Sequence, residues 1–374
     1  MNTITRLAFA ANLATPGVLA AQARDSATAG KTPPVSPVSV TGSVTTSFTS
    51  STRALNDTIV GRLYDRRQNE FMLNVANLTV ERLPATDRWE AGFHVEAWFG
   101  QNAAVVKSAG LNLGSEADIW QAYTAFSIPL SGAGRYLQIR AGKMATLMGV
   151  EVGEDVLNPN LDNASQDIFL EPFTETGIEV DGKFSPRLDA ELRVTNGWDQ
   201  VTDVNHAKSV MARLGLTPDD KTLIALLGFV GPEQANNTRN ERLGAEALLS
   251  RKIGPASTAW LQLDYGQEAG AAQGGGQAKW SAAGAWLTYD VAATTTLALR
   301  GDYMNDRDGA RTSGLFGFPV NAGQKVGSAT ATLNIKRWDH ALLRPEIRYD
   351  HSTLPVFNTN HSQLTISLGL SYIF

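Results

Sequence analysis

The chain contains no cysteine in its 374 residues, which excludes disulfide bridges and metal sites built from thiolates. Beyond its first residues it also lacks any run of eighteen or more apolar residues, so a transmembrane helix is excluded. The five histidines lack the spacing of a helical zinc motif, and we predict neither a metal site nor a cofactor. The formal net charge of −5 at pH 7 argues against a nucleic-acid partner.

Sequence motifs of known catalytic sites are missing as well. There is no G-x-S-x-G nucleophile elbow and no G-x-x-x-x-G-K-[ST] phosphate loop. The glycine run 274–276 is predicted to be a loop tip, because no helix follows it. The segment 306–309 is predicted to be a turn, because it lacks the distal glutamate of a calcium loop. We therefore predict that the protein is not an enzyme.

The first 23 residues have the features of a signal peptide. Arg6 supplies a positive charge, 7–19 form a moderately apolar stretch, and Ala21 and Ala23 make a small-x-small cleavage site. The following residues, 24–37, become rich in proline and are predicted to form a periplasmic linker. We expect 38–374 to form one large domain of an exported protein.

The last eleven residues alternate strictly between two kinds of side chain. Over 364–374, apolar side chains fall on one face of a strand and small or polar ones on the other, because successive strand side chains point to opposite faces. Leu370, Tyr372 and the terminal Phe374 resemble the closing strand of bacterial outer-membrane β-barrels, which their assembly machinery recognises. The resemblance implies a C-terminal assembly signal.

The same alternation recurs along the chain and predicts sixteen strands. Their ranges are 38–49, 69–82, 88–100, 117–129, 134–148, 174–185, 188–198, 207–216, 221–230, 240–252, 257–268, 278–291, 295–305, 324–337, 340–352 and 362–374. Seven short connections alternate with eight long ones, as expected for periplasmic turns and extracellular loops. A propeller or a sandwich would not separate its connections in this way. The predicted fold is all-β, a transmembrane antiparallel β-barrel of about 16 strands.

Alternation alone does not say which face of each strand meets water. The signal peptide and the C-terminal pattern favour apolar side chains facing lipid and polar ones facing a water-filled lumen. Seven of the eight tryptophans lie toward strand ends and are predicted to form two aromatic girdles at the membrane interfaces. The strands 221–230 and 278–291 are apolar on both faces. This leaves open a contact with a neighbouring subunit, a contact with an inserted loop, or a wrong register.

Short motifs make 38–374 similar to one family, the OmpL-like β-barrel porins of Gram-negative bacteria. The residues that carry the resemblance are Arg140, Gly142, Lys143, Gly149, Glu151, Thr176, Gly177, Asn196, Gly197, Trp198, Asp199, Asp203, Asn205, Lys208 and Ser209. The resemblance implies a passive outer-membrane pore, with Gly142, Lys143 and 196–199 as structural landmarks. The stretch 158–165 matches the asparagine- and serine-rich loop of the family loosely, which leaves loop conformation and selectivity open.

The connection 149–173 is the longest, and it contains no lysine or arginine. Such a long loop is usually functional, and in sixteen-stranded porins the third long loop narrows the lumen. The acidic residues predicted to form the constriction are Glu151, Glu154, Asp155, Asp162, Asp167 and Glu171. The arginines predicted to face them from the pore wall are Arg140, Arg193, Arg213, Arg242, Arg300, Arg344 and Arg348. Opposed charges would create a transverse field, unless the arginines pair with carboxylates of the same wall.

These patterns favour an outer-membrane porin that passes small hydrophilic solutes and ions by passive diffusion. The expected partners are the lipid bilayer with its lipopolysaccharide, the outer-membrane assembly machinery, the solutes and, by analogy, further copies in a homotrimer. The alternatives are a substrate-selective anion channel, a membrane-embedded hydrolase and a structural barrel with a plugged lumen. A serine and a histidine within hydrogen-bonding reach on an outward-facing or rim position would favour the hydrolase.

Overall fold

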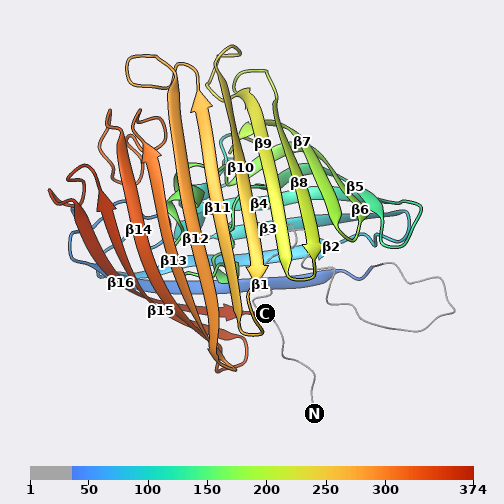
Figure 1. The fold of residues 1–374 in the computed structure, drawn as a ribbon, viewed down its shortest axis with the longest axis horizontal. Coiled ribbons are helices and arrows are strands. Elements are labelled where there is room, and N and C mark those ends of the chain that lie inside the picture. The colour runs from blue at the N-terminus through green and yellow to red at the C-terminus, as the bar shows by residue number, and fades with distance from the viewer. Residues whose placement is uncertain (1–35) are drawn as a thin grey trace.

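The computed structural model describes residues 36–374. The predicted signal peptide 1–23 and nearly all of the predicted linker 24–37 lie outside the described residues. The described part forms one closed antiparallel barrel, in which each strand pairs with its neighbours in sequence and the first strand pairs with the last (Figure 1). The fold class predicted from alternation is confirmed.

Every predicted strand overlaps one strand of the barrel wall. The strands are β1 (Ser39–Ser51), β2 (Phe71–Arg82), β3 (Glu90–Phe99), β4 (Ala117–Pro129), β5 (Tyr136–Ala145), β6 (Thr174–Ser185), β7 (Leu188–Trp198), β8 (Ser209–Asp219), β9 (Thr222–Pro232), β10 (Glu241–Lys252), β11 (Ser257–Glu268), β12 (Ala278–Ala292), β13 (Thr295–Asp306), β14 (Gln324–Ile335), β15 (Ala341–Ser352) and β16 (Ser362–Ile373). Three short helical segments lie in the connections: α1 (Gln101–Val106), η1 (Asp155–Leu157) and α2 (Ser165–Phe169). Within 36–374, no helix has the length and apolar character needed to span a membrane.

Short and long connections alternate around the barrel. Two residues join β6 to β7, β8 to β9 and β12 to β13, whereas the connection between β5 and β6 covers 146–173 and that between β1 and β2 covers 52–70. Because neighbouring strands are antiparallel, the short turns share one rim of the barrel and the long loops share the other. The predicted asymmetry of the connections is therefore confirmed.

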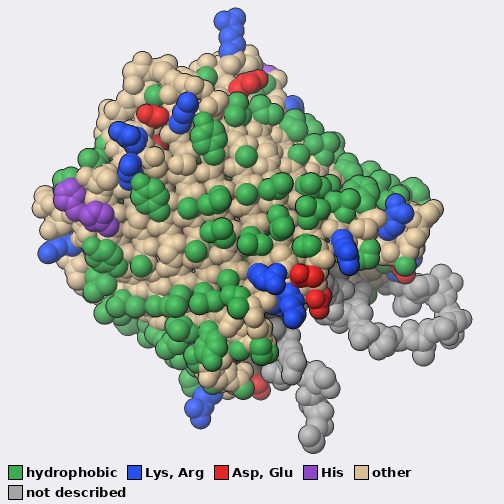
Figure 2. Space-filling view, viewed as in Figure 1, with side chains coloured by type: hydrophobic (Ala, Val, Ile, Leu, Met, Phe, Trp, Pro, Cys, Tyr) green, Lys and Arg blue, Asp and Glu red, His purple; other side chains and the backbone are tan. Residues whose placement is uncertain are grey.

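The two faces of each strand differ in polarity. In β16, Ile366 and Leu368 are exposed on the outside, whereas Thr365 and Ser367 are buried toward the lumen. Figure 2 shows hydrophobic side chains spread over the outer wall, with the charged side chains mainly toward its margins. The free energy of the protein is lower when lipid rather than water covers an outward apolar belt.

The tryptophans do not form the predicted girdles. Trp98, Trp120, Trp198, Trp260, Trp280 and Trp286 are buried, and Trp89 and Trp338 are exposed. Trp98 stacks on Trp120 with ring centroids 4.3 Å apart, and its indole N–H donates to Glu96. The prediction is wrong because a position near a strand end does not say which face carries the side chain. Outward positions hold tyrosine and phenylalanine instead, such as Tyr289 and Phe126.

The two strands that are apolar on both faces contact a loop inside the barrel. Leu227 and Phe229 of β9 point inward and pack with Met148 of the connection 146–173. Trp286 of β12 packs with Ala164 of the same connection. Of the three explanations that the sequence leaves open, the contact with an inserted loop is the one found.

The barrel closes where β1 meets β16. The N–H groups of Gly42 and Phe374 each donate to the carbonyl oxygen of the other, both at 3.0 Å. A Cβ on Gly42 would lie 2.4 Å from the Asn77 carbonyl oxygen and 2.7 Å from Cζ of Phe374, so glycine allows the terminal ring to pack on β1. Leu370, Tyr372 and Phe374 are all exposed on the outer face of this seam.

Deleting Phe374 should weaken the closing seam. The deletion removes both backbone hydrogen bonds to Gly42, worth about 1–3 kcal/mol together, and it removes the ring contact. We expect a lower folded fraction when the denatured protein is refolded into detergent across a urea series and followed by heat-modifiable gel mobility. Phe374→Tyr keeps the backbone and the ring and should refold like the wild type. Equal folded fractions for the deletion and the wild type would contradict this role of the seam.

Candidate constriction site in the barrel lumen

The connection 146–173 lies inside the barrel, and we call it the inserted loop. Near its start, the Gly149 N–H donates to Glu246 on β10 at 2.9 Å. Farther along, the Asn160 side-chain nitrogen donates to the hydroxyl of Thr332 on β14 at 2.7 Å. Hydrogen bonds to inward-facing side chains thus hold the loop against a wide arc of the wall.

Three of the predicted wall arginines bind the inserted loop directly. Arg300 on β13 donates to Glu151 at 2.8 Å, and Arg348 on β15 pairs with Asp162. Arg344 on β15 donates to two backbone carbonyl oxygens of the loop, at 2.7 and 2.8 Å. Loop and wall charges therefore neutralise one another in contact here, rather than facing each other across a gap.

The other four predicted arginines pair with carboxylates of the wall. These ion pairs are Arg140 with Glu179 (2.7 Å) and Asp181 (3.2 Å), Arg193 with Glu175 (2.8 Å) and Glu179 (2.5 Å), Arg213 with Asp189 (2.7 Å) and Glu191 (2.9 Å), and Arg242 with Glu268 (2.8 Å). A charge removed from water is tolerated when it is paired in this way. These four arginines thus pair with carboxylates of the same wall, which the sequence leaves open as the alternative to a transverse field across the pore.

The six acidic residues predicted at the constriction differ in exposure. Glu151, Asp155, Asp162, Asp167 and Glu171 are buried. Glu154 is half-buried, and Nε1 of Trp120 (3.0 Å) and Nε2 of Gln121 (3.3 Å) donate to its Oε1. In the segment 152–157 around Glu154, Leu157 is exposed and Asp155 is buried, and the other residues are half-buried, whereas 158–172 is buried throughout.

The acidic groups of the inserted loop also differ in proton affinity. Burial and then the nearby Glu96 carboxylate raise the pKa of Glu154 to about 8. Burial raises the pKa of Asp167 to about 7. Burial opposes ionisation of Asp162 too, but Arg348 and other arginines hold its pKa below the ordinary value. Asp162 is therefore ionised at neutral pH, whereas Glu154 is mainly protonated.

The connection 52–70 also enters the lumen, whereas the sequence predicts it to be an extracellular loop. Arg62 donates to Asp162 of the inserted loop at 2.6 Å, and the Tyr64 hydroxyl donates to a carbonyl oxygen of that loop at 3.0 Å. The apolar residues of 59–64 are buried. An apolar run within a predicted exposed loop is the signal that could have revealed this insertion.

The landmark residues inferred from the family resemblance make structural contacts. The Lys143 ammonium donates to Asp118 on β4 at 2.7 Å. The Asp199 carboxylate accepts the backbone N–H groups of Phe173 (2.7 Å) and Thr174 (3.0 Å). Asp199 thereby fixes the point at which the inserted loop returns to β6.

Comparisons with known proteins agree with this architecture. The chain matches the model of the family described as "Putative beta-barrel porin-2, OmpL-like" over residues 37–374. No curated protein sequence matches it. It resembles the outer membrane channel DcaP of Acinetobacter baumannii, with 12% identity, a TM-score of 0.61 and coverage of 92% of this chain and 99% of that chain.

Two further solved structures share the fold. An anion-selective porin from Comamonas acidovorans has 10% identity and a TM-score of 0.60, with coverage of 91% of this chain and 100% of that chain. The trimer form of OmpT, an outer membrane protein of Vibrio cholerae, has 9% identity and a TM-score of 0.57, with the same coverage, 91% and 100%. The family match spans the whole barrel, and the chain belongs to the OmpL-like β-barrel porin family, as a porin channel of the bacterial outer membrane.

Proposed function

We propose that the protein is a passive diffusion channel for small hydrophilic solutes and ions, narrowed by the inserted loop. In this proposal Glu154 is the loop carboxylate that acts on passing ions. One observation supports it above all: 158–172 is buried throughout, whereas 152–157 retains exposed surface and includes Glu154. Ions in the passage interact most strongly with the groups that line it. The buried acids then hold the loop in place, and Glu154 supplies the local charge.

At a pH at which all its charged groups are ionised, one wall of the barrel would favour cations over anions. On β6, β7 and β8 and on the neighbouring β5, four basic residues pair with five acidic ones. The basic residues are Arg140, Lys183, Arg193 and Arg213, and the acidic ones are Glu175, Glu179, Asp181, Asp189 and Glu191. This network has one carboxylate in excess when all nine groups are ionised. A lumen lined by this sign of charge attracts cations.

A substrate-selective anion channel is the second candidate. The inward arginines and the similarity to an anion-selective porin from Comamonas acidovorans support it. However, each of the seven predicted wall arginines already donates to a carboxylate or carbonyl oxygen or pairs with a carboxylate. An anion would have to displace these partners before it could bind.

We propose that the channel assembles as a homotrimer and carries lipopolysaccharide against its outer face. The solved trimer form of the Vibrio cholerae OmpT supports the first part by analogy. Recognition of Leu370, Tyr372 and Phe374 by the outer-membrane assembly machinery is supported by the exposure of all three side chains on β16 and its end.

At pH 9, Glu154→Gln should reduce the cation preference of single channels. One charge a few ångströms from a passing ion is worth on the order of 1 kcal/mol through water, or about fivefold in relative permeability. The reversal potential in a planar bilayer under a KCl gradient measures this preference. Asp87→Asn, which neutralises an exposed carboxylate in a short turn, should leave it unchanged. An unaltered reversal potential for Glu154→Gln would remove Glu154 from the mechanism, and a silent folded barrel would favour a plugged lumen.

The cation preference of the wild type should rise between pH 7 and pH 9. Burial and Glu96 raise the pKa of Glu154 to about 8, so its carboxyl is mainly neutral at pH 7 and mainly ionised at pH 9. The same reversal-potential measurement across this range tests the expectation. Glu154→Gln should lack this part of the response, because an amide does not titrate. Identical pH profiles for both proteins would assign the titration to another group.

One observation bears on the hydrolase candidate. His351 on β15 and Ser362 on β16 are cross-strand partners, with the His351 Nδ1 2.9 Å from the Ser362 oxygen. The Tyr349 hydroxyl donates to the same oxygen at 2.8 Å. A catalytic histidine needs a third group to orient it. Within 36–374, no carboxylate is found hydrogen-bonded to His351, so the geometry fits a structural contact better than a catalytic pair.

The purified protein should release no more fatty acid from phospholipid vesicles than Ser362→Ala does. The Ser362–His351 pair lacks an orienting carboxylate, and a serine activated by an unoriented histidine is a weak nucleophile. A fluorescent fatty-acid assay measures the release. Hydrolysis that Ser362→Ala abolishes and Ser257→Ala on β11 preserves would instead establish an enzymatic activity.

A further inference from the structure

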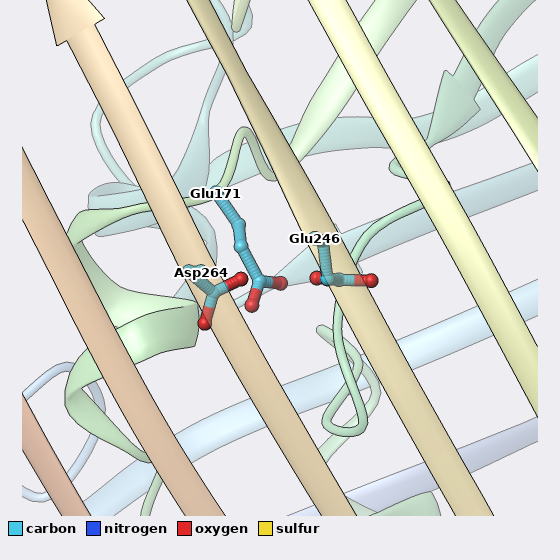
Figure 3. Close-up of side chains that lie close together, drawn as sticks. All are labelled: Glu171, Glu246 and Asp264. Carbon is cyan, nitrogen blue, oxygen red and sulfur yellow. The ribbon is translucent and has the colours of Figure 1, made fainter.

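Three buried carboxylates meet between the inserted loop and the barrel wall. Figure 3 shows Glu171, near the end of the loop, pointing between Glu246 on β10 and Asp264 on β11, and one oxygen of each lies within 4.8 Å of the others. All three side chains are buried. None of the ion pairs found in 36–374 includes any of the three. The three carboxyl groups therefore lack a lysine or arginine partner in contact.

Hydrogen bonds leave the cluster incompletely satisfied. Nε2 of Gln262 lies 2.6 Å from Glu171 Oε1, 3.2 Å from Glu246 Oε2 and 3.2 Å from Asp264 Oδ2. A carboxamide has two N–H protons, so it cannot serve three carboxylates fully. Oε2 of Glu171 is buried and has no hydrogen-bond partner. A buried acceptor of this kind points to a ligand, because a buried oxygen without a hydrogen-bond partner or a bound ion costs free energy of folding.

The backbone of the inserted loop is shaped around this unpartnered oxygen. Gly149 has a φ of +94°, and a Cβ at this residue would lie 2.3 Å from Glu171 Oε2. The Gly149 N–H donates to Glu246 at 2.9 Å. Glycine at this position therefore gives the Glu171 carboxylate room and also orients the carboxylate of Glu246.

We propose that Glu171, Glu246 and Asp264 bind one calcium ion, which ties the end of the inserted loop to β10 and β11. Calcium takes carboxylate oxygens at about 2.3–2.6 Å, so ligands on opposite sides of the ion are up to about 5 Å apart. The oxygens of this cluster, within 4.8 Å of one another, meet that limit. Magnesium dehydrates reluctantly and usually keeps several waters, so it is less suited than calcium to a buried cluster of three protein carboxylates. The sequence alone does not indicate this site, because its three ligands come from separate segments of the chain.

Protons are the competing occupants of the cluster. Burial and then Glu246 raise the pKa of Glu171 well above its ordinary value, so the cluster holds protons when no cation is bound. Calcium has to displace them, because metal ligands bind in the deprotonated form. The affinity for calcium should therefore increase with pH.

Calorimetric titration of the EGTA-stripped protein in non-ionic detergent with calcium chloride tests the proposal. We expect one calcium ion per chain, tighter binding at pH 8 than at pH 6, and a higher thermal unfolding temperature with calcium. Glu246→Gln should weaken the binding by at least about tenfold, since even outer-shell changes cost 10–100-fold at metal sites. None of these measurements requires the barrel to conduct, so their outcome is separate from that of the diffusion channel proposed above.

Glu346→Gln is the matched control. Glu346 is a buried wall glutamate on β15 that accepts a hydrogen bond from the Leu161 N–H of the inserted loop at 2.7 Å, away from the cluster. This variant should bind calcium like the wild type. If Glu246→Gln does not fold, Asp264→Asn takes its place, and the stoichiometry and pH dependence of the wild type test the site without any variant. The absence of calcium binding by the wild type, or equal binding by Glu246→Gln, would overturn the proposal.

Discussion

A strand in a bilayer has to pair every backbone N–H and C=O group with a neighbouring strand, and the rest of this structure depends on that constraint. This constraint requires β1 to pair with β16, and the closed sheet then has an inside and an outside. Because side chains alternate along each strand, closure sends one half of them into the lumen. A barrel of sixteen strands is too wide for those side chains to fill. The long connections 52–70 and 146–173 occupy part of the remaining space.

Charge compensation determines how these connections lie in the lumen. The inserted loop contains acids and no base, and the wall supplies the missing bases through Arg300 and Arg348. An unpaired buried charge would cost several kcal/mol, so the loop conformation depends on its fit to the wall. Arg62, from the connection 52–70, adds a third positive charge around Asp162. The two inserted segments therefore stabilise each other as well as the wall.

The parts of this architecture that depend on local pattern could be predicted from the sequence. Alternation in segments such as 364–374 marks the strands and separates the two faces of each, because it reflects a two-residue period of the backbone itself. Contacts between distant segments have no such local signature. Nothing near Trp98 indicates that it stacks on Trp120 inside the barrel, and nothing near Arg300 indicates that Glu151 is its partner. The sequence could place Glu171 in a long loop, but it could not show that Glu246 and Asp264 lie beside it.

Burial divides the acids of the inserted loop into two kinds. An acid paired with arginine, such as Asp162, is ionised, but the arginine charge cancels most of the electrostatic potential that it would exert on an ion in the passage. An acid placed among other carboxylates, such as Glu171, has a raised affinity for a proton or a cation. Glu154 combines a carboxylate neighbour with exposed surface. Among the six predicted constriction acids, we therefore propose Glu154 as the one whose charge changes while the loop stays anchored, which is the physical requirement for a group that tunes a pore.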